Sequence, residues 1–293
     1  MRVFFAVLLI ALPGTLIADD LIFAEGSEWE IVSDDHQFAE GMAWDQEGNF
    51  IFTDVPRGQL FRVDKSTGLK TLIDGETGRA NGIAFGPDGK LYGCANEDEG
   101  INAWDPVTWE KVTLGKGASL NDIAILDDGT IFFTDPKSSS VWRIDAGTKE
   151  RSLAASLAWR PNGIALSLNQ ATLLVAQFDS DTVYGFSITR ESRLSGQNRP
   201  AYKLAVPSDG LGRLDGMQVI GDGRLIIGTN LGLQVAMPVG ENAPSTPLIV
   251  VPSPEGRPRC NYARISPDNE WIYTAYAKDI LRRRLKTGFG LAR

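Results

Sequence analysis

The stretch that decides the fold is "GIAFGPDGKLYGC", residues 82–94, which follows Asn81. The same pattern returns at residues 121–135 as "NDIAILDDGTIFFTD". Each copy has a polar first residue, a short apolar run, an Asp-Gly pair and a second apolar run. Two apolar runs joined by Asp-Gly are typical of an antiparallel β-hairpin with a two-residue turn. The sequence therefore predicts a hairpin that the chain repeats.

The pattern occurs six times, at intervals of roughly 40 to 50 residues. A turn position lies at a constant offset within each copy, which disfavours the alternative of unrelated hairpins in a β-sandwich. A third apolar run follows each hairpin, and a fourth run precedes the next copy. Four strands per repeat predict an all-β fold, a six-bladed β-propeller with four antiparallel strands per blade. The copies begin at Glu40, Asn81, Asn121, Asn162, Asp215 and Asn261, and we expect the fourth strands at 70–73, 111–114, 152–156, 203–206 and 248–251.

The two ends of the chain are expected to close the ring. The last repeat has no fourth strand, whereas residues 29–32, "WEIV", belong to no hairpin. Pairing these residues with the last blade removes two open sheet edges. We therefore expect one domain over residues 19–293, and we expect the residues preceding Ala24 to add little to its stability.

The first 18 residues resemble a secretory signal peptide. Arg2 precedes an apolar run that is too short to span a membrane, and Ala18 is a plausible cleavage position. An uncleaved anchor is the alternative. We expect a secreted or periplasmic protein. Its net charge of −8 disfavours nucleic acid and anionic membrane surfaces as partners. Cys94 and Cys260 do not make a disulfide framework, and they fall too far apart in the predicted ring to bridge.

The first residue of each repeat is predicted to lie at one mouth of the central tunnel, because the innermost strand of every propeller blade faces the tunnel. Symmetry then gathers two carboxylates and four amides. Such a set of oxygen donors suits a hard divalent cation. The alternative interpretation is that the Asn-Gly and Asp-Gly pairs only mark turns. We favour the cation site, because the hairpin turn already lies elsewhere in each repeat.

Several segments together resemble the gluconolactonase and senescence-marker-protein (regucalcin-like) family. They are residues 40–64, "EGMAWDQEGNFIFTDVPRGQLFRVD", residues 121–136, residues 160–166, "RPNGIAL", and residues 214–219, "LDGMQV". The resemblance covers about residues 29–290. It implies a six-bladed propeller with one divalent cation in the tunnel and hydrolysis of sugar lactones.

Matching the motifs residue by residue implies roles for four side chains. Glu40, Asn162 and Asp215 match the metal ligands, and Asp215 also matches the proposed general base. Asn121 matches an asparagine that contacts metal or substrate. Calcium is the first choice of cation, with zinc, magnesium or manganese as alternatives. Two departures are Ser119, where the family often has arginine, and Leu214, where it usually has proline.

Four repeats carry an arginine two positions before their first residue. Positions two apart in an extended segment point the same way, so these side chains are predicted to rim the mouth. One interpretation is that they neutralise nearby carboxylates. The other, in which Arg160 and Arg213 bind substrate, favours an anionic lactone. The four are Arg79, Arg160, Arg213 and Arg259.

Other chemistries have weaker support in the sequence. A Ser-His-Asp triad would have to use His36, the chain's one histidine, and no G-x-S-x-G motif is present. We interpret His36 as a loop residue, with a role at the mouth as the alternative. We therefore expect a metal-dependent lactonase that is monomeric and acts on a small lactone or ester. A phosphotriester or fluorophosphate hydrolase and a non-catalytic binding propeller stay open.

Overall fold

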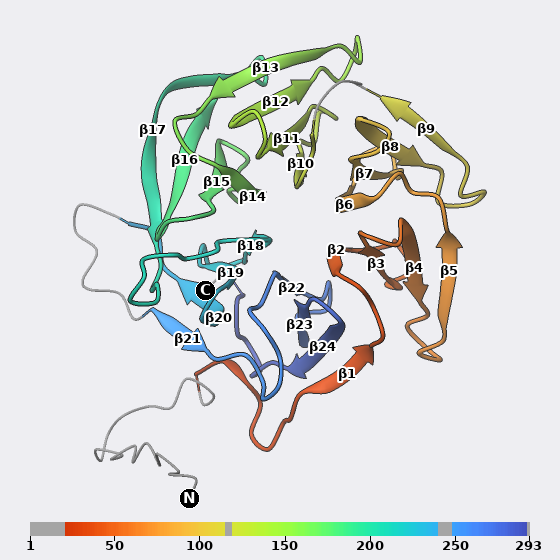
Figure 1. Ribbon diagram of the computed structural model, residues 1–293, viewed down its shortest axis with the longest axis vertical. Helices are drawn as coiled ribbons and strands as arrows, with labels where there is room; N and C mark the ends of the chain where they lie inside the picture. The colour runs from red at the N-terminus through yellow and green to blue at the C-terminus, as the bar shows by residue number, and fades with distance from the viewer. Residues whose placement is uncertain (1–20, 115–118, 240–247, 292–293) are drawn as a thin grey trace, which may run out of the picture.

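The computed structural model describes residues 21–114, 119–239 and 248–291, and every named element in them is a β-strand. Six sheets of four antiparallel strands surround a central axis, as Figure 1 shows. This confirms the predicted six-bladed propeller. The signal peptide expected over residues 1–18 lies outside the described residues. No helix in the described ranges is long and apolar enough to cross a membrane.

The strands of each blade follow one another from the axis outward. The innermost strands are β2 (Ala39–Trp44), β6 (Ala80–Phe85), β10 (Ile123–Ile125), β14 (Pro161–Leu166), β18 (Met217–Val219) and β22 (Tyr262–Ile265). The second strands are β3 (Phe50–Asp54), β7 (Leu91–Ala95), β11 (Ile131–Asp135), β15 (Thr172–Gln177), β19 (Leu225–Thr229) and β23 (Trp271–Tyr276). The third strands are β4 (Gln59–Val63), β8 (Gly100–Trp104), β12 (Ser140–Ile144), β16 (Thr182–Ile188), β20 (Gly232–Ala236) and β24 (Asp279–Arg284). The outermost strands are β5 (Lys70–Asp74), β9 (Lys111–Leu114), β13 (Arg151–Ser156), β17 (Leu194–Lys203), β21 (Ile249–Val251) and β1 (Glu30–Ser33).

The expected fourth strand at 203–206 is wrong. The outer strand of that blade is β17, which pairs with β16 and ends where the expected strand begins. Two breaks in the register along β17 accommodate Gly196 and Pro200. Proline is tolerated on such an edge strand because its missing N–H faces solvent or a bulge.

The repeated turns also differ from the two-residue turn that the sequence suggests. In each hairpin the second turn residue donates its N–H to the carbonyl three positions earlier, and only that residue has a positive φ. This geometry is a type I turn followed by a left-handed residue, a three-residue connection. The left-handed position is held by Gly48, Gly89, Gly129, Gln170, Gly223 and Asn269.

The apolar core lies between the blades rather than at the axis. Six of the buried clusters each join two neighbouring sheets, one cluster for every junction in the ring. Alternate residues of a strand point to opposite faces, so one strand supplies two junctions. On β3, for example, Phe50 and Phe52 pack toward the last blade, whereas Ile51 packs toward the second.

An N-terminal strand closes the ring as predicted, although β1 begins and ends one residue later than the expected strand at 29–32. β1 pairs antiparallel with β24, with Glu30 opposite Arg282. The expectation that the residues before Ala24 contribute little is wrong. Ile22 and Phe23 are both buried in the junction between the last two blades, where Phe23 bridges to Leu285. The ring closure therefore depends on the buried side chains of Ile22 and Phe23 as well as on β1.

Candidate active site

The tunnel mouth is formed by the first residues of the repeats, and hydrogen bonds between blades position them. The Thr53 hydroxyl donates to the backbone carbonyl of Asn81 at 3.0 Å, and the Thr134 hydroxyl donates to that of Asn162 at 2.6 Å. Each threonine lies on the second strand of the preceding blade. Because these contacts use backbone carbonyls, the amide side chains remain available to the tunnel.

Glycine follows four of the six first residues because the next blade approaches closely. A Cβ on Gly41 would lie 2.2 Å from the carbonyl oxygen of Asn81, and one on Gly163 would lie 2.0 Å from that of Asp215. Neither glycine has a positive φ among the described backbone. The Asn-Gly and Asp-Gly pairs are therefore close-approach sites and not turns, which removes the structural alternative considered for them.

Five of the six first residues contribute side-chain oxygens that other protein groups leave available. Four of them have a buried oxygen without a hydrogen-bond partner among the described residues, and the fifth is a carboxyl group beside one of these four. In the described part of the chain, the buried Oδ1 atoms of Asn81, Asn121, Asn162 and Asp215 have no hydrogen-bond partner. Glu40 is buried beside Asp215. Buried polar atoms without partners are costly, so such a group indicates a missing ligand. Asn261 differs, because its side chain donates to the carbonyl of Ala39 and accepts from the N–H of Ala277. It is a structural member of the ring.

The two carboxyl groups of the mouth hold protons more tightly than free carboxyls. Burial raises the pKa of Glu40 well above its ordinary value, and the neighbouring Asp215 raises it further. Burial also raises the pKa of Asp215, although the Arg259 guanidinium opposes that shift. Arg259 Nη1 lies 2.6 Å from Asp215 Oδ2. The pair orients Asp215 and leaves its Oδ1 free.

Asp122 is a site residue that the sequence interpretation missed. It occupies the position that glycine holds in four repeats, and its Oδ1 accepts a hydrogen bond from the hydroxyl of Tyr262 at 3.2 Å. Asp122 belongs to the third blade and Tyr262 to the sixth, so this contact crosses the tunnel below the mouth. Burial raises the pKa of Asp122 to about 6. The two departures from glycine in the repeat were the signal that could have found this polar floor.

His36 lies away from the mouth, in the loop between β1 and β2. Its Nε2 lies 2.7 Å from Ser33 Oγ, and its Nδ1 lies 3.4 Å from Asp54 Oδ2. The Lys70 ammonium donates to the same serine hydroxyl at 3.0 Å. Ser33, His36 and Asp54 are all buried. The trio ties the closing strand to the first blade, in agreement with the loop interpretation of His36.

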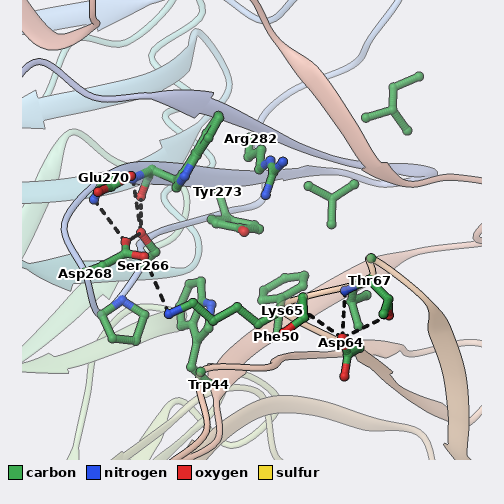
Figure 2. A pocket seen from close by; sticks show the side chains of 18 residues that line it. Trp44, Phe50, Asp64, Lys65, Thr67, Ser266, Asp268, Glu270, Tyr273 and Arg282 are labelled. Carbon is green, nitrogen blue, oxygen red and sulfur yellow. Dashed lines mark hydrogen bonds and ion pairs between the residues drawn. The ribbon is translucent and has the colours of Figure 1, made fainter.

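Two hollows between the blades lie at the end of the propeller opposite the mouth. A groove of about 580 Å³ lies between the first and last blades, where Trp44, Phe50 and Tyr273 pack together and Lys65 also lines the wall (Figure 2). A second hollow of about 410 Å³ lies at the far end of the tunnel and is lined mainly by apolar side chains. Neither contains the unpartnered oxygens of the mouth, so we place the candidate site at the mouth.

The residues expected to bind a cation are those that the fold brings together. Glu40, Asn162 and Asp215 converge, and the unpartnered oxygens fit a hard cation that prefers oxygen ligands. No group of three or more His, Cys, Asp or Glu side chains in the described ranges is arranged to hold a metal ion. The donor set therefore depends on its asparagines.

Comparison with known proteins gives the family. The model of the SMP-30/gluconolactonase/LRE-like region matches residues 38–241. The chain belongs to this family. A gluconolactonase from Zymomonas mobilis is 26% identical, with 96% of this chain and 84% of the relative covered.

Proteins of known structure share this fold. A gluconolactonase from Xanthomonas campestris is 20% identical with a TM-score of 0.73, covering 89% of this chain and 90% of the other. The calcium-binding regucalcin from Agrobacterium tumefaciens is 13% identical with a TM-score of 0.71, covering 91% and 97%. At these identities the likeness shows the fold. The roles of individual residues must come from the site itself.

Proposed function

We propose that this SMP-30/gluconolactonase family member is a divalent-cation-dependent hydrolase of sugar lactones. The observation that carries the proposal is the set of unpartnered oxygens of Asn121, Asn162 and Asp215 beside the carboxyl of Glu40. Family membership and the gluconolactonase relatives support a lactone as substrate. The oxygen-only donor set supports calcium, as does the regucalcin neighbour.

Glu40, Asn162 and Asp215 would hold the cation, and Asn121 would contact the cation or the substrate. A bound cation would polarise the lactone carbonyl and stabilise the negative charge that develops on its oxygen. Asp215 would accept a proton from the attacking water at Oδ1, because Arg259 occupies Oδ2. Glu40 is the second choice for that role.

The test is a panel of neutral sugar lactones assayed before and after treatment with a chelator, with calcium, zinc, magnesium and manganese restored separately. The proposal expects hydrolysis that the chelator removes and one of the cations restores. Hydrolysis unaffected by chelation would remove the cation from the mechanism. Activity on phosphotriesters alone, or cation binding without any hydrolysis, would favour the other two functions considered above.

We also propose that the protein is exported and monomeric, and that its mature chain begins at about Asp19. The apolar N-terminal run of residues 3–12, preceded by Arg2, is the observation behind export. N-terminal sequencing of the protein recovered from the periplasm or medium tests the cleavage. A mature protein that still begins at Met1 would contradict it. Light scattering tests the monomer.

A further inference from the structure

Three guanidinium groups of the mouth converge on one aromatic ring, that of Phe178. The Cζ atoms of Arg160, Arg213 and Arg259 lie 4.3, 5.3 and 5.4 Å from the ring centroid. Phe178 follows β15 and is buried. Its N–H donates to the carbonyl of Arg160, and its own carbonyl accepts from the N–H of Leu214. The backbone thus fixes this ring between two of the arginines.

The three arginines differ in how well their charges are paired. Arg259 makes a short ion pair with the buried Asp215. Arg213 is 4.0 Å from the exposed carboxylate of Asp179. Arg160 is exposed and has no ion pair or hydrogen bond through its side chain within the described residues. Direct pairing with a buried carboxylate therefore accounts for Arg259 alone among the three, although the charge of Arg160 also acts on Asp215 from a greater distance.

Like charges gathered on one ring repel one another, and cation–π attraction to a single phenylalanine offsets only part of that repulsion. If Asp215 also binds a cation, Arg259 shares the Asp215 carboxylate with that cation. Less negative charge is then available to balance the three arginines. An anion at this rim would relieve the repulsion. Guanidinium groups suit a carboxylate in particular, since they can donate two parallel hydrogen bonds to it.

Arg79, at the equivalent repeat position, provides an internal comparison. It lies 3.8 Å from Glu97 in an exposed pair and does not contact Phe178. Arg160, Arg213 and Arg259 therefore gather around Phe178 on the rim of the fourth, fifth and sixth blades, whereas Arg79 lies apart from them. This gives the mouth a positive side that extends from the fourth blade to the sixth.

We propose that Arg160, Arg213 and Phe178 form a subsite, with Arg259, for a carboxylate on the substrate. The preferred substrate is then the lactone of a sugar diacid, which carries a carboxylate at the carbon furthest from the lactone carbonyl. This inference rests on the proposed lactonase function and adds the substrate class. Arg160 is its main determinant, because its side chain is exposed and unpaired.

The experiment compares two lactones with the same ring, D-glucaro-1,4-lactone and D-glucono-1,4-lactone, which differ in bearing a carboxylate or a hydroxymethyl group. For the wild type, kcat/KM should be at least about tenfold higher for the acidic lactone than for the neutral one. A difference of this size corresponds to one charged hydrogen-bonded pair with the carboxylate. Arg160→Ala should bring the ratio of kcat/KM for the acidic lactone to kcat/KM for the neutral lactone down to about one. Arg79→Ala is the matched control and should preserve the wild-type ratio. Raising the salt concentration should reduce the preference in the wild type and in Arg79→Ala, and should have no preference left to reduce in Arg160→Ala.

Calorimetric titration with the open-chain acids separates this inference from the lactonase function. Glucarate carries two carboxylates and gluconate one, and neither requires turnover. Tighter binding of glucarate that Arg160→Ala abolishes supports the subsite even if no lactone is hydrolysed. Hydrolysis of both lactones with equal losses in Arg160→Ala would overturn the subsite and leave the lactonase standing. Equal binding of both acids by the wild type would also overturn it.

Discussion

Arg259 Nη1 lies 2.6 Å from Asp215 Oδ2, and these residues come from adjacent blades. The pair places a cation against the carboxylate that we assign as general base. It also leaves Asp215 Oδ1 as a buried oxygen without a hydrogen-bond partner in the described structure. One arginine thus determines which oxygen of Asp215 faces the mouth.

Arg259→Gln should lower the free energy of unfolding by about 2 kcal/mol, because it removes a charged hydrogen bond from a buried carboxylate. Arg79→Gln removes the exposed pair with Glu97 and should change it by less than about 1 kcal/mol. Urea denaturation in the presence of a chelator measures both. Calcium should stabilise Arg259→Gln more than the wild type. Equal effects of the two substitutions would show that the Asp215 contact does not matter for stability.

Phe23 should matter as much as the closing strand. Its ring packs at 5.5 Å against Trp29, and Arg283 lies over it at 4.0 Å. Phe23→Ala should cost about 3 kcal/mol by leaving a cavity in a blade junction. Leu69→Ala, at an exposed outer position, is the control and should cost little. A melting temperature for Phe23→Ala equal to that of the control would show that the ring is closed by β1 alone.

The hairpins could be predicted from the sequence because the second strand of a blade is buried on both faces. Every residue of β3, β11 and β19 is buried, so their apolar and β-branched residues stand out. Outer strands are less predictable. β17 has mostly exposed or half-buried residues, so packing places little constraint on its sequence, and the apolar residues after it were mistaken for the strand.

The two thiols should be unreactive in the folded protein. Cys94 and Cys260 are free and fully buried, which confirms that they do not bridge. Burial raises the pKa of Cys94 well above its ordinary value and that of Cys260 to about 12. A thiol reagent such as Ellman's should modify neither at pH 8, and should modify both in denaturant. Rapid modification under native conditions would contradict this placement.

His36 should make stability fall in mild acid. Burial lowers its pKa below 6.5, and the charge of Lys70 lowers it further. The unfolded chain therefore takes up the proton first, so the contribution of neutral His36 is complete above about pH 7 and is lost as the pH falls through 6.5. A His36→Gln variant is the control, because its carboxylates titrate as those of the wild type do. Between pH 7 and about 5, the wild type should lose more of its unfolding free energy than the variant does. Parallel pH profiles would contradict the assignment.

The candidate site was only partly predictable. Repeat position predicted that the six first residues gather at one mouth, because symmetry brings equivalent residues to one place, and the family resemblance then selected Glu40, Asn162 and Asp215 among them. Repeat position could not show that Asn261 differs from the other first residues, because its amide makes two hydrogen bonds with the backbone. Nor could it find Phe178, because the contacts of its ring with Arg213 and Arg259 join different blades.

The shared cation site is tested most directly by calorimetric titration of calcium into metal-free protein. We expect one site in the wild type, and a loss of affinity of about 100-fold or more in Glu40→Gln and in Asp215→Asn, since each removes a charged ligand. Asp179→Asn removes an exposed carboxylate from the same rim and should bind calcium like the wild type. Unchanged calcium affinity in both Glu40→Gln and Asp215→Asn would contradict the account.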